Sequence, residues 1–138
     1  MKTIIIGKQF TDDPSGRFYT DGNGSGEEFR EEILIPALKL HGHICIDISS
    51  NVEGYGSSFL SEAFGGVIKY GYYTKEELLK SIDIIVTENM NSYNFYKEKI
   101  IEYINNSVPS GNKYISTKEE ALKKGIFKER LNYQSIIE

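Results

Sequence analysis

The fold of this chain is centred on the segment His43-Ile44-Cys45-Ile46-Asp47-Ile48-Ser49-Ser50, which leads through residues 51–58 into Phe59-Leu60-Ser61-Glu62-Ala63-Phe64-Gly65-Gly66. Apolar residues at every second position predict a strand over residues 43–49. A glycine-containing loop follows, and Ser57 or Ser58 is predicted to cap a helix that continues to about Ile68. Such a corner presents free N–H groups and the positive end of a helix dipole, so we expect the functional site there.

The rest of the chain alternates strands and helices. Residues 2–8 and 82–87 are rich in β-branched residues and are predicted to be strands. Further helices are predicted after four start signals: Ser25, Thr74, Asn91 or Ser92, and Thr117. This alternation predicts a single-domain α/β fold with a mostly parallel sheet. We expect strands 43–49 and 82–87 to lie side by side and parallel inside the sheet, with strand 43–49 packed on both faces.

Proline and glycine predict three further features. The turn signal at residues 12–16 allows residues 17–20 to fold back on the first strand as an N-terminal hairpin. Pro36 lies inside a predicted helix, so we expect a kink or a second start there. The break at residues 109–111 divides the chain into a domain over residues 1–110 and a C-terminal extension over residues 111–138.

The extension is predicted to hold a short strand at residues 113–116, a helix after Thr117, and a weakly packed tail over residues 126–138. Its charge differs from that of the domain. Residues 111–138 carry six basic and four acidic side chains, whereas residues 1–110 carry ten and sixteen.

Composition excludes several classes of protein. The 138 residues are 39% hydrophobic and 12% aromatic, which suits one compact domain with one core. A net charge of −4 without a basic stripe disfavours binding to nucleic acid. The apolar runs are far shorter than the ~18 residues of a membrane span, and no signal peptide is recognisable. We therefore expect a cytoplasmic protein that binds neither nucleic acid nor membrane.

The residues that could bind a metal or catalyse a reaction do not converge. His43, Cys45 and Asp47 share one strand face, but ligands at this spacing rarely meet at one ion, and no second ligand pair exists. Cys45 is expected to pack as a small hydrophobic residue. A serine hydrolase would need a histidine near Ser57, whereas His41 and His43 lie at the other end of the strand, roughly 20 Å away. We expect no metal, no cofactor and no enzymatic activity.

A second glycine-rich loop, Gly22-Asn23-Gly24-Ser25-Gly26, suggests an alternative function. Together with the start of the Ser57 helix, it could bind a small anionic ligand or a nucleotide. It lacks the lysine of a P-loop, does not match the dinucleotide fingerprint, and is followed at once by Glu27 and Glu28. These glutamates and Glu31 and Glu32 are expected to form a solvated acidic face, in which Arg30 could organise a partner surface.

Several segments resemble the signature of the bacterial STAS-like domain family of unknown function. They lie within residues 14–70: Gly16-Arg17-Phe18, Asp21-Gly22, Ser25-Gly26-Glu27, Phe29-Arg30-Glu31, Leu34, Pro36, Leu38, Ile46-Asp47 and Ser57-Ser58-Phe59-Leu60-Ser61-Glu62-Ala63-Phe64-Gly65-Gly66. That family is distantly similar to the STAS domains of anti-sigma-factor antagonists. The resemblance therefore implies a STAS-like fold, in which helices pack on a mixed sheet.

In those antagonists, a partner kinase that is also the anti-sigma factor phosphorylates a serine in an Asp-Ser-Ser-Gly-Leu segment at a helix start. Gly56-Ser57-Ser58-Phe59-Leu60 occupies that place, so Ser57 matches the phospho-acceptor and Ser58 its neighbour. Gly56 and Phe59 replace the aspartate and the glycine. The resemblance implies a regulatory protein-interaction module that works by partner switching.

The implied partner is a histidine-kinase-type ATPase or anti-sigma factor. We expect the partner- or anion-binding surface to comprise Gly54, Tyr55, Gly56, Glu62, Ser25 and Arg30. The residues alone leave another interpretation open, in which Ser57 and Ser58 are only helix caps and Glu62 is a solvated helix residue.

Overall fold

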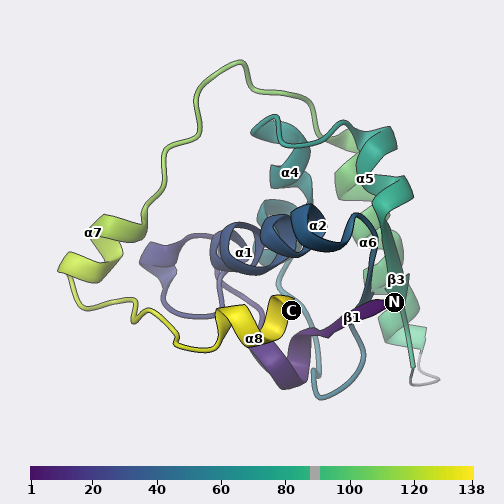
Figure 1. The fold of residues 1–138 in the computed structure, drawn as a ribbon, viewed down its shortest axis with the longest axis horizontal. Coiled ribbons are helices and arrows are strands. Elements are labelled where there is room, and N and C mark those ends of the chain that lie inside the picture. Colours follow the sequence, from purple (N-terminus) through teal and green to yellow (C-terminus); the bar gives the residue numbers. More distant parts are fainter. Residues whose placement is uncertain (88–90) are drawn as a thin grey trace.

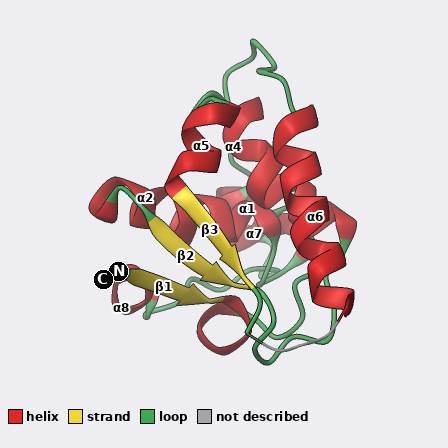
Figure 2. Ribbon diagram, turned by 90° about the vertical axis from the view of Figure 1, so that its right-hand side faces the viewer, coloured by secondary structure: helices red, strands yellow, loops and turns green. Residues whose placement is uncertain are grey.

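The computed structural model describes residues 1–87 and 91–138. Within these residues, three short strands form one parallel sheet in the order β1 (Lys2–Ile5), β2 (Ile44–Asp47) and β3 (Ile82–Ile85). The register aligns Ile4 with Ile46 and Ile46 with Ile84, so the apolar side chains form rows across the sheet. Figure 2 shows the strands side by side, with α1 and α2 behind them. The α/β fold with parallel strands is confirmed.

The sheet buries one face. The row Ile4, Ile46 and Ile84 is buried, whereas the next row is only half-buried or exposed: Thr3, Cys45 and Asp83. The strands 43–49 and 82–87 are adjacent and parallel, as expected, but only β2 is interior. The expectation that both are interior, and that β2 is packed on both faces, is wrong. A sheet with three strands has one interior position, and its fully buried row points to one side.

Two long helices pack against each other and form much of the core. The first, helix 26–41, runs through α1 (Gly26–Glu28), a π-helical stretch (Phe29–Leu34) and α2 (Ile35–His41). The second, helix 57–69, runs through α3 (Ser57–Leu60), a π-helical stretch (Ser61–Gly65) and α4 (Gly66–Lys69). Both keep right-handed helical backbone angles at their internal junctions. Each therefore acts as one continuous helix.

Pro36 does not restart helix 26–41. Leu34 and Ile35 directly before it have helical backbone angles, so the chain passes through the proline without leaving the helix. The irregularity expected there takes the form of the π-helical stretch, which ends at Leu34. A π-helical turn is wider than an α-helical one, which gives the proline ring room beside the preceding backbone.

The remaining helices up to residue 123 begin close to their predicted start signals, whereas the helix over residues 133–137 lies in the tail, for which no helix was predicted. Thr74 caps α5 (Lys75–Ser81) in a capping box with Glu77. The other three are α6 (Asn91–Asn106), α7 (Lys118–Lys123) and α8 (Tyr133–Ile137). In the described part of the chain, none of the helices has the length and apolar character that crossing a bilayer requires.

The N-terminal hairpin is absent from the described residues. After β1 the chain makes a π-helical turn (Ile6–Phe10), and a 3-10 turn (Tyr19–Asp21) stands where the second strand was expected. The Asp21 carboxylate accepts hydrogen bonds from the N–H groups of Arg17 and Phe18, at 3.1 and 2.8 Å. Because these donors are used locally, they cannot form a ladder with β1, which pairs with β2 instead.

Residues 107–117 arch over the body of the protein to α7 without forming a helix or strand (Figure 1), so the strand expected at residues 113–116 is absent. The tail that follows is not weakly packed. The Phe127 ring is 1% exposed and lies 4.8 Å from the ring of Tyr19, and Ile136 is 3% exposed in the main core. The tail therefore packs against residues from the first part of the chain. The boundary at residue 110 stays a prediction.

Candidate functional site

The loop before helix 57–69 is anchored on both sides. Tyr55 is buried, and its hydroxyl donates a hydrogen bond of 2.8 Å to the carbonyl of Ile48. Gly56 donates its N–H to the carbonyl of Pro14 at 2.9 Å. A Cβ at Gly56 would lie 3.0 Å from the backbone of Ser15, so any larger residue would push the two segments apart. This close approach explains why a glycine precedes Ser57.

Ser57 is exposed at the first position of helix 57–69. Gly56 is the N-cap residue, with φ −73° and ψ 140°, and among residues 1–87 and 91–138 no side-chain hydrogen bond caps the helix. The expectation that Ser57 or Ser58 is the cap is therefore wrong. Because no side chain satisfies the first N–H groups, they remain available to water or to an anion, next to the positive end of the helix dipole.

Ser58 contacts an arginine that the sequence did not single out as a site residue. The Arg17 guanidinium donates to the Ser58 hydroxyl at 3.4 Å and lies 3.5 Å from a carboxylate oxygen of Glu62. Its side chain is 40% exposed. One signal could have identified Arg17, because it is the single basic residue between Lys8 and Arg30. It places a positive charge beside the start of helix 57–69.

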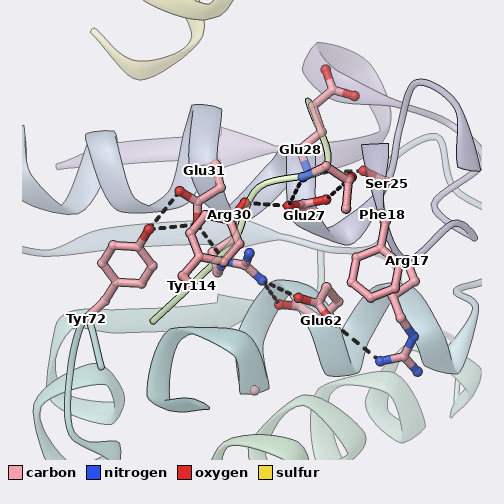
Figure 3. A network of polar contacts seen from close by, with 12 residues as sticks. Arg17, Phe18, Ser25, Glu27, Glu28, Arg30, Glu31, Glu62, Tyr72 and Tyr114 are labelled. Atoms are coloured by element: carbon pink, nitrogen blue, oxygen red, sulfur yellow. Dashed lines mark hydrogen bonds and ion pairs between the residues drawn. The ribbon is translucent and has the colours of Figure 1, made fainter. Parts of the chain in front are cut away.

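Glu62 forms a buried ion pair with Arg30 on helix 26–41. Nη1 of Arg30 donates to the Glu62 carboxylate at 2.8 Å and to the Glu62 carbonyl at 2.7 Å (Figure 3). Nε of Arg30 donates to Glu31 at 2.8 Å. A Cβ at Gly66 would lie 2.3 Å from Nη1, so only glycine leaves room for the guanidinium. The pair therefore joins the two long helices.

The charge of Arg30 is stabilised in spite of its burial. Burial by itself lowers the pKa of Arg30, but hydrogen bonds to Glu31 and Glu62 outweigh this effect and hold that pKa above its usual value. The guanidinium carbon also lies 4.7 and 5.1 Å from the ring centroids of Tyr70 and Tyr114. Aromatic faces attract a cation at such distances. Arg30 is therefore a fixed, charged part of the core.

The acidic face expected on helix 26–41 is not solvated. Glu27 and Glu28 are fully buried, as are Ser25 and Arg30, and Glu62 is 3% exposed. Arg30 and Ser25 were expected on a partner- or anion-binding surface, but burial withdraws both from direct contact with a partner. Glu62, expected there or as a solvated helix residue, is buried as well. Their contribution to any surface is indirect, through the positions of the two helices.

The buried glutamates are held by hydrogen-bond donors from distant segments. Glu27 accepts from the N–H of Tyr19 at 3.1 Å, from the Thr117 hydroxyl at 2.7 Å and from the Tyr114 hydroxyl. Glu28 accepts from Arg130 at 2.7 Å and from the Tyr133 hydroxyl at 2.6 Å. Tyr114, Thr117, Arg130 and Tyr133 all belong to the predicted C-terminal extension. The extension is therefore bound to helix 26–41 through this acidic face.

The glycine-rich loop at residues 22–26 has little capacity left for an anion. The N–H groups of Gly22 and Gly26 donate to the carbonyls of Tyr19 and Gly16, at 3.0 and 2.9 Å. The N–H of Gly24 donates to the Glu28 carboxylate at 2.7 Å. Ser25 caps helix 26–41, because its hydroxyl accepts from the N–H of Glu28 at 3.0 Å. These contacts argue against the loop as a ligand pocket.

Asp47 is a buried polar residue at the carboxyl end of β2, which the sequence suggested as a metal ligand and as part of the family signature. It accepts hydrogen bonds from the N–H groups of Ser49 and Ser50, at 2.9 and 3.2 Å, and from both hydroxyls. Burial tends to raise the pKa of Asp47, but these hydrogen bonds outweigh it and hold that pKa below its usual value. Asp47 therefore fixes the turn that leads toward the Ser57 loop.

The other two residues of the metal hypothesis have partners of their own. Nε2 of His43 lies 2.8 Å from the Asp83 carboxylate, and the Cys45 sulfur lies 3.3 Å from the Met1 sulfur. In residues 1–87 and 91–138, no group of three His, Cys, Asp or Glu side chains is arranged to hold a metal ion.

A comparison with protein-family models matches residues 25–92 to the STAS-like domain of unknown function (DUF4325). The match includes both long helices, the Arg30–Glu62 pair and the Ser57 corner. No curated protein and no solved structure matches the chain significantly.

Proposed function

Because residues 25–92 match the model of the STAS-like domain family, we propose that this chain is a non-enzymatic regulatory module that binds a protein partner in the cytoplasm. The binding surface is centred on Ser57. The observation that carries this proposal is the exposed Ser57 hydroxyl at a helix start that no side chain caps. An exposed hydroxyl in that position is accessible to a kinase and lies beside groups that stabilise a negative charge.

A shallow apolar groove next to Ser57 provides a place for a partner side chain. It has a volume of about 100 Å³ and is lined by Tyr55, Ser57, Leu60, Phe95, Tyr96, Lys99 and Tyr103. Phe95 is 52% exposed, and its ring packs edge-on against Tyr96 at 5.6 Å. Exposed aromatic side chains beside a charged group are typical of the centres of protein interfaces. An apolar side chain of the partner would pack here.

Phosphorylation of Ser57 would change this surface strongly. A phosphate adds about −1.5 to −2 charge units at neutral pH. The uncapped helix start, Lys99 in the groove and Arg17 beside Ser58 form a setting that favours such a charge. The charge would then lie at the edge of the apolar groove and disfavour an apolar partner. We propose this as the switch between bound and free states.

The proposed partner is a histidine-kinase-type ATPase that acts as an anti-sigma factor. The test combines three measurements on the purified chain and candidate ATPases of this type from its gene neighbourhood. Phosphorylation is read by mass spectrometry after incubation with ATP, affinity by calorimetry, and stability by thermal unfolding. The variants are Ser57→Asp, Ser57→Ala and the same two changes at Ser58.

Ser57→Asp is expected to weaken partner binding at least tenfold and to leave the melting temperature nearly unchanged, because aspartate interacts favourably with the helix dipole. Ser57→Ala is expected to retain binding and stability, since the hydroxyl does not cap the helix. Ser116→Asp is the matched control, because Ser116 is also exposed and accepts the N–H of Lys118 at the start of α7. Equal binding by all variants would refute the switch.

A small-ligand function at the same corner remains the second candidate. Its support is the uncapped start of helix 57–69. The glycine loop that was expected to complete the pocket uses the N–H groups of Gly22, Gly24 and Gly26 internally. The protein-binding function is therefore the better supported of the two.

A further inference from the structure

A small pocket lies beside Glu62, between helix 57–69 and the end of α6. Its volume is about 160 Å³, close to the space that about five water molecules occupy in the liquid. Its lining includes two cationic side chains, an amide and the backbone of two glycines: Arg17, Lys69, Asn106, Gly65 and Gly66. The Ser107 hydroxyl also lines it and donates to the Gly65 carbonyl at 2.8 Å, which ties the end of α6 to the helix. This hydrogen bond fixes the two walls of the pocket relative to each other.

The two cations of this pocket have little compensation from carboxylates. Within residues 1–87 and 91–138, Lys69 forms no ion pair, and its ammonium group lies 5.4 Å from the centroid of the Tyr70 ring. In the same residues, the Arg17 guanidinium has long contacts of 3.4 and 3.5 Å to Ser58 and Glu62 and lies 6.0 Å from the centroid of the Phe18 ring. Both side chains can therefore turn toward a ligand without breaking a short ion pair.

Glu62 is the one acidic residue in the lining, and its charge is already neutralised. Its carboxylate is 2% exposed, and the second carboxylate oxygen is held by Arg30 at 2.8 Å. Charge pairs at this distance in a buried setting are much less screened than pairs in water. The charge that the pocket offers to a ligand is therefore positive, although the chain as a whole carries −4.

We propose that this pocket binds a compact oxyanion of the phosphate class. Arg17 and Lys69 would supply charge-assisted hydrogen bonds, and the Asn106 amide would add a neutral donor. An oxyanion with five heavy atoms fits a volume of about five waters. The site lies on the flank of helix 57–69 and shares Arg17 with the Ser57 corner, whereas Lys69 and Asn106 belong to the pocket.

The test is a titration of the full chain with inorganic phosphate, in which chloride keeps the ionic strength constant. Chemical shifts of the Gly66, Lys69 and Asn106 amides report occupancy of the pocket. We expect a saturable change, and a dissociation constant at least tenfold higher in Lys69→Gln and in Arg17→Gln. Lys124→Gln is the matched control, since Lys124 is exposed and pairs with Glu120. It is expected to bind phosphate as the unchanged chain does.

A parallel titration with acetate distinguishes a phosphate-class ligand from a carboxylate. Acetate is expected to bind at least tenfold more weakly, because it offers fewer acceptor oxygens to the same donors. Equal affinity for acetate would overturn the assignment to the phosphate class. The absence of a saturable change, or equal phosphate affinity in Lys69→Gln and Lys124→Gln, would overturn the site. Lys69 is exposed, so its substitution tests binding without threatening the fold. No protein partner enters this test, and Lys69 has no role in the switch proposed at Ser57, so the Lys69→Gln result is independent of that switch.

Discussion

Glu62 shows how one side chain can connect three segments of the chain. Glu62 lies on helix 57–69. It accepts hydrogen bonds from Arg30 on helix 26–41 and from Arg17 on the loop before helix 26–41. Removing one partner of a buried pair leaves the other charge without compensation, which costs more than the pair contributes. Arg30 would keep only Glu31 as a carboxylate partner.

Glu62→Gln is expected to lower the free energy of unfolding by about 3–5 kcal/mol, the usual cost of breaking a buried pair. The measurement is urea unfolding followed by circular dichroism. Glu120→Gln is the control, because its pair with Lys124 has both side chains more than half exposed. A surface pair of this kind contributes less than about 0.5 kcal/mol. If the two variants unfold at the same urea concentration, the Arg30–Glu62 pair does not stabilise the fold.

For single residues, the sequence predicted the place in a helix better than the burial of the side chain. Ser25 was correctly identified as a helix cap, whereas Ser57 and Ser58 were not caps, because Gly56 takes the N-cap position of their helix. Glu62, Glu27 and Glu28 were expected in solvent, and all three are buried. The side-chain donors that neutralise them lie 32 to 105 positions away in the chain, as for Arg30 with Glu62 and Tyr133 with Glu28. A local pattern contains no information about such contacts.

The two long helices approach each other closely at Gly26. A Cβ at this position would lie 2.6 Å from the carbonyl oxygen of Phe59 and 3.0 Å from the backbone nitrogen of Ala63. Both neighbours are backbone atoms and cannot rotate away. The glycine in the Ser25-Gly26-Glu27 segment is therefore required by the crossing of helix 26–41 over helix 57–69.

Gly26→Ala is expected to destabilise the protein by about 1–3 kcal/mol, because overpacking forces the two backbones apart. Gly65→Ala is a suitable control. Its Cβ would meet no atom closer than 3.4 Å, and alanine favours the helix relative to glycine. We expect Gly65→Ala to be neutral or stabilising by thermal unfolding. A lower melting temperature for Gly65→Ala than for Gly26→Ala would contradict this account of the crossing.

Strands and helix starts were predictable where residues close together in the sequence specify them. Strands β2 and β3 and the capped start of α5 follow from alternation and a capping box. The hairpin was wrong because the Asp21 side chain competes with the sheet for the N–H groups of Arg17 and Phe18. The position of β3 at the edge depends on how many strands the sheet has, and no single segment encodes that number.

For the whole molecule, the C-terminal segment is an integral part of the core. Phe127 packs with Tyr19 and Ala121 in a separate small cluster, and Ile136 joins the main core. Arg130 neutralises the buried Glu28. The sequence predicted a weakly packed tail from the break at residues 109–111 and the change in charge, whereas the residues that the tail covers lie near the other end of the chain.

Phe127→Ala is expected to cost about 3–5 kcal/mol, as usual for a buried phenylalanine. Truncation after Gly125 removes Phe127, Arg130 and Ile136 together, so we expect it to unfold the domain, given a total stability of about 5–15 kcal/mol. Leu131→Ala is the control, because Leu131 is fully exposed, and it should change stability by no more than about 0.5 kcal/mol. The measurement is the melting temperature of these three variants in thermal unfolding. A truncated chain that melts as the full chain does would show that the tail is dispensable.

The burial of Glu27 and Glu28 also has a consequence for the order of events during translation. Helix 26–41 leaves the ribosome long before Tyr114, Thr117, Arg130 and Tyr133 exist, so its two carboxylates must stay hydrated until those residues arrive. At the usual rate of synthesis this interval is about 5–20 s. The native burial of these two carboxylates can therefore be completed only after nearly all of the 138 residues have been synthesised.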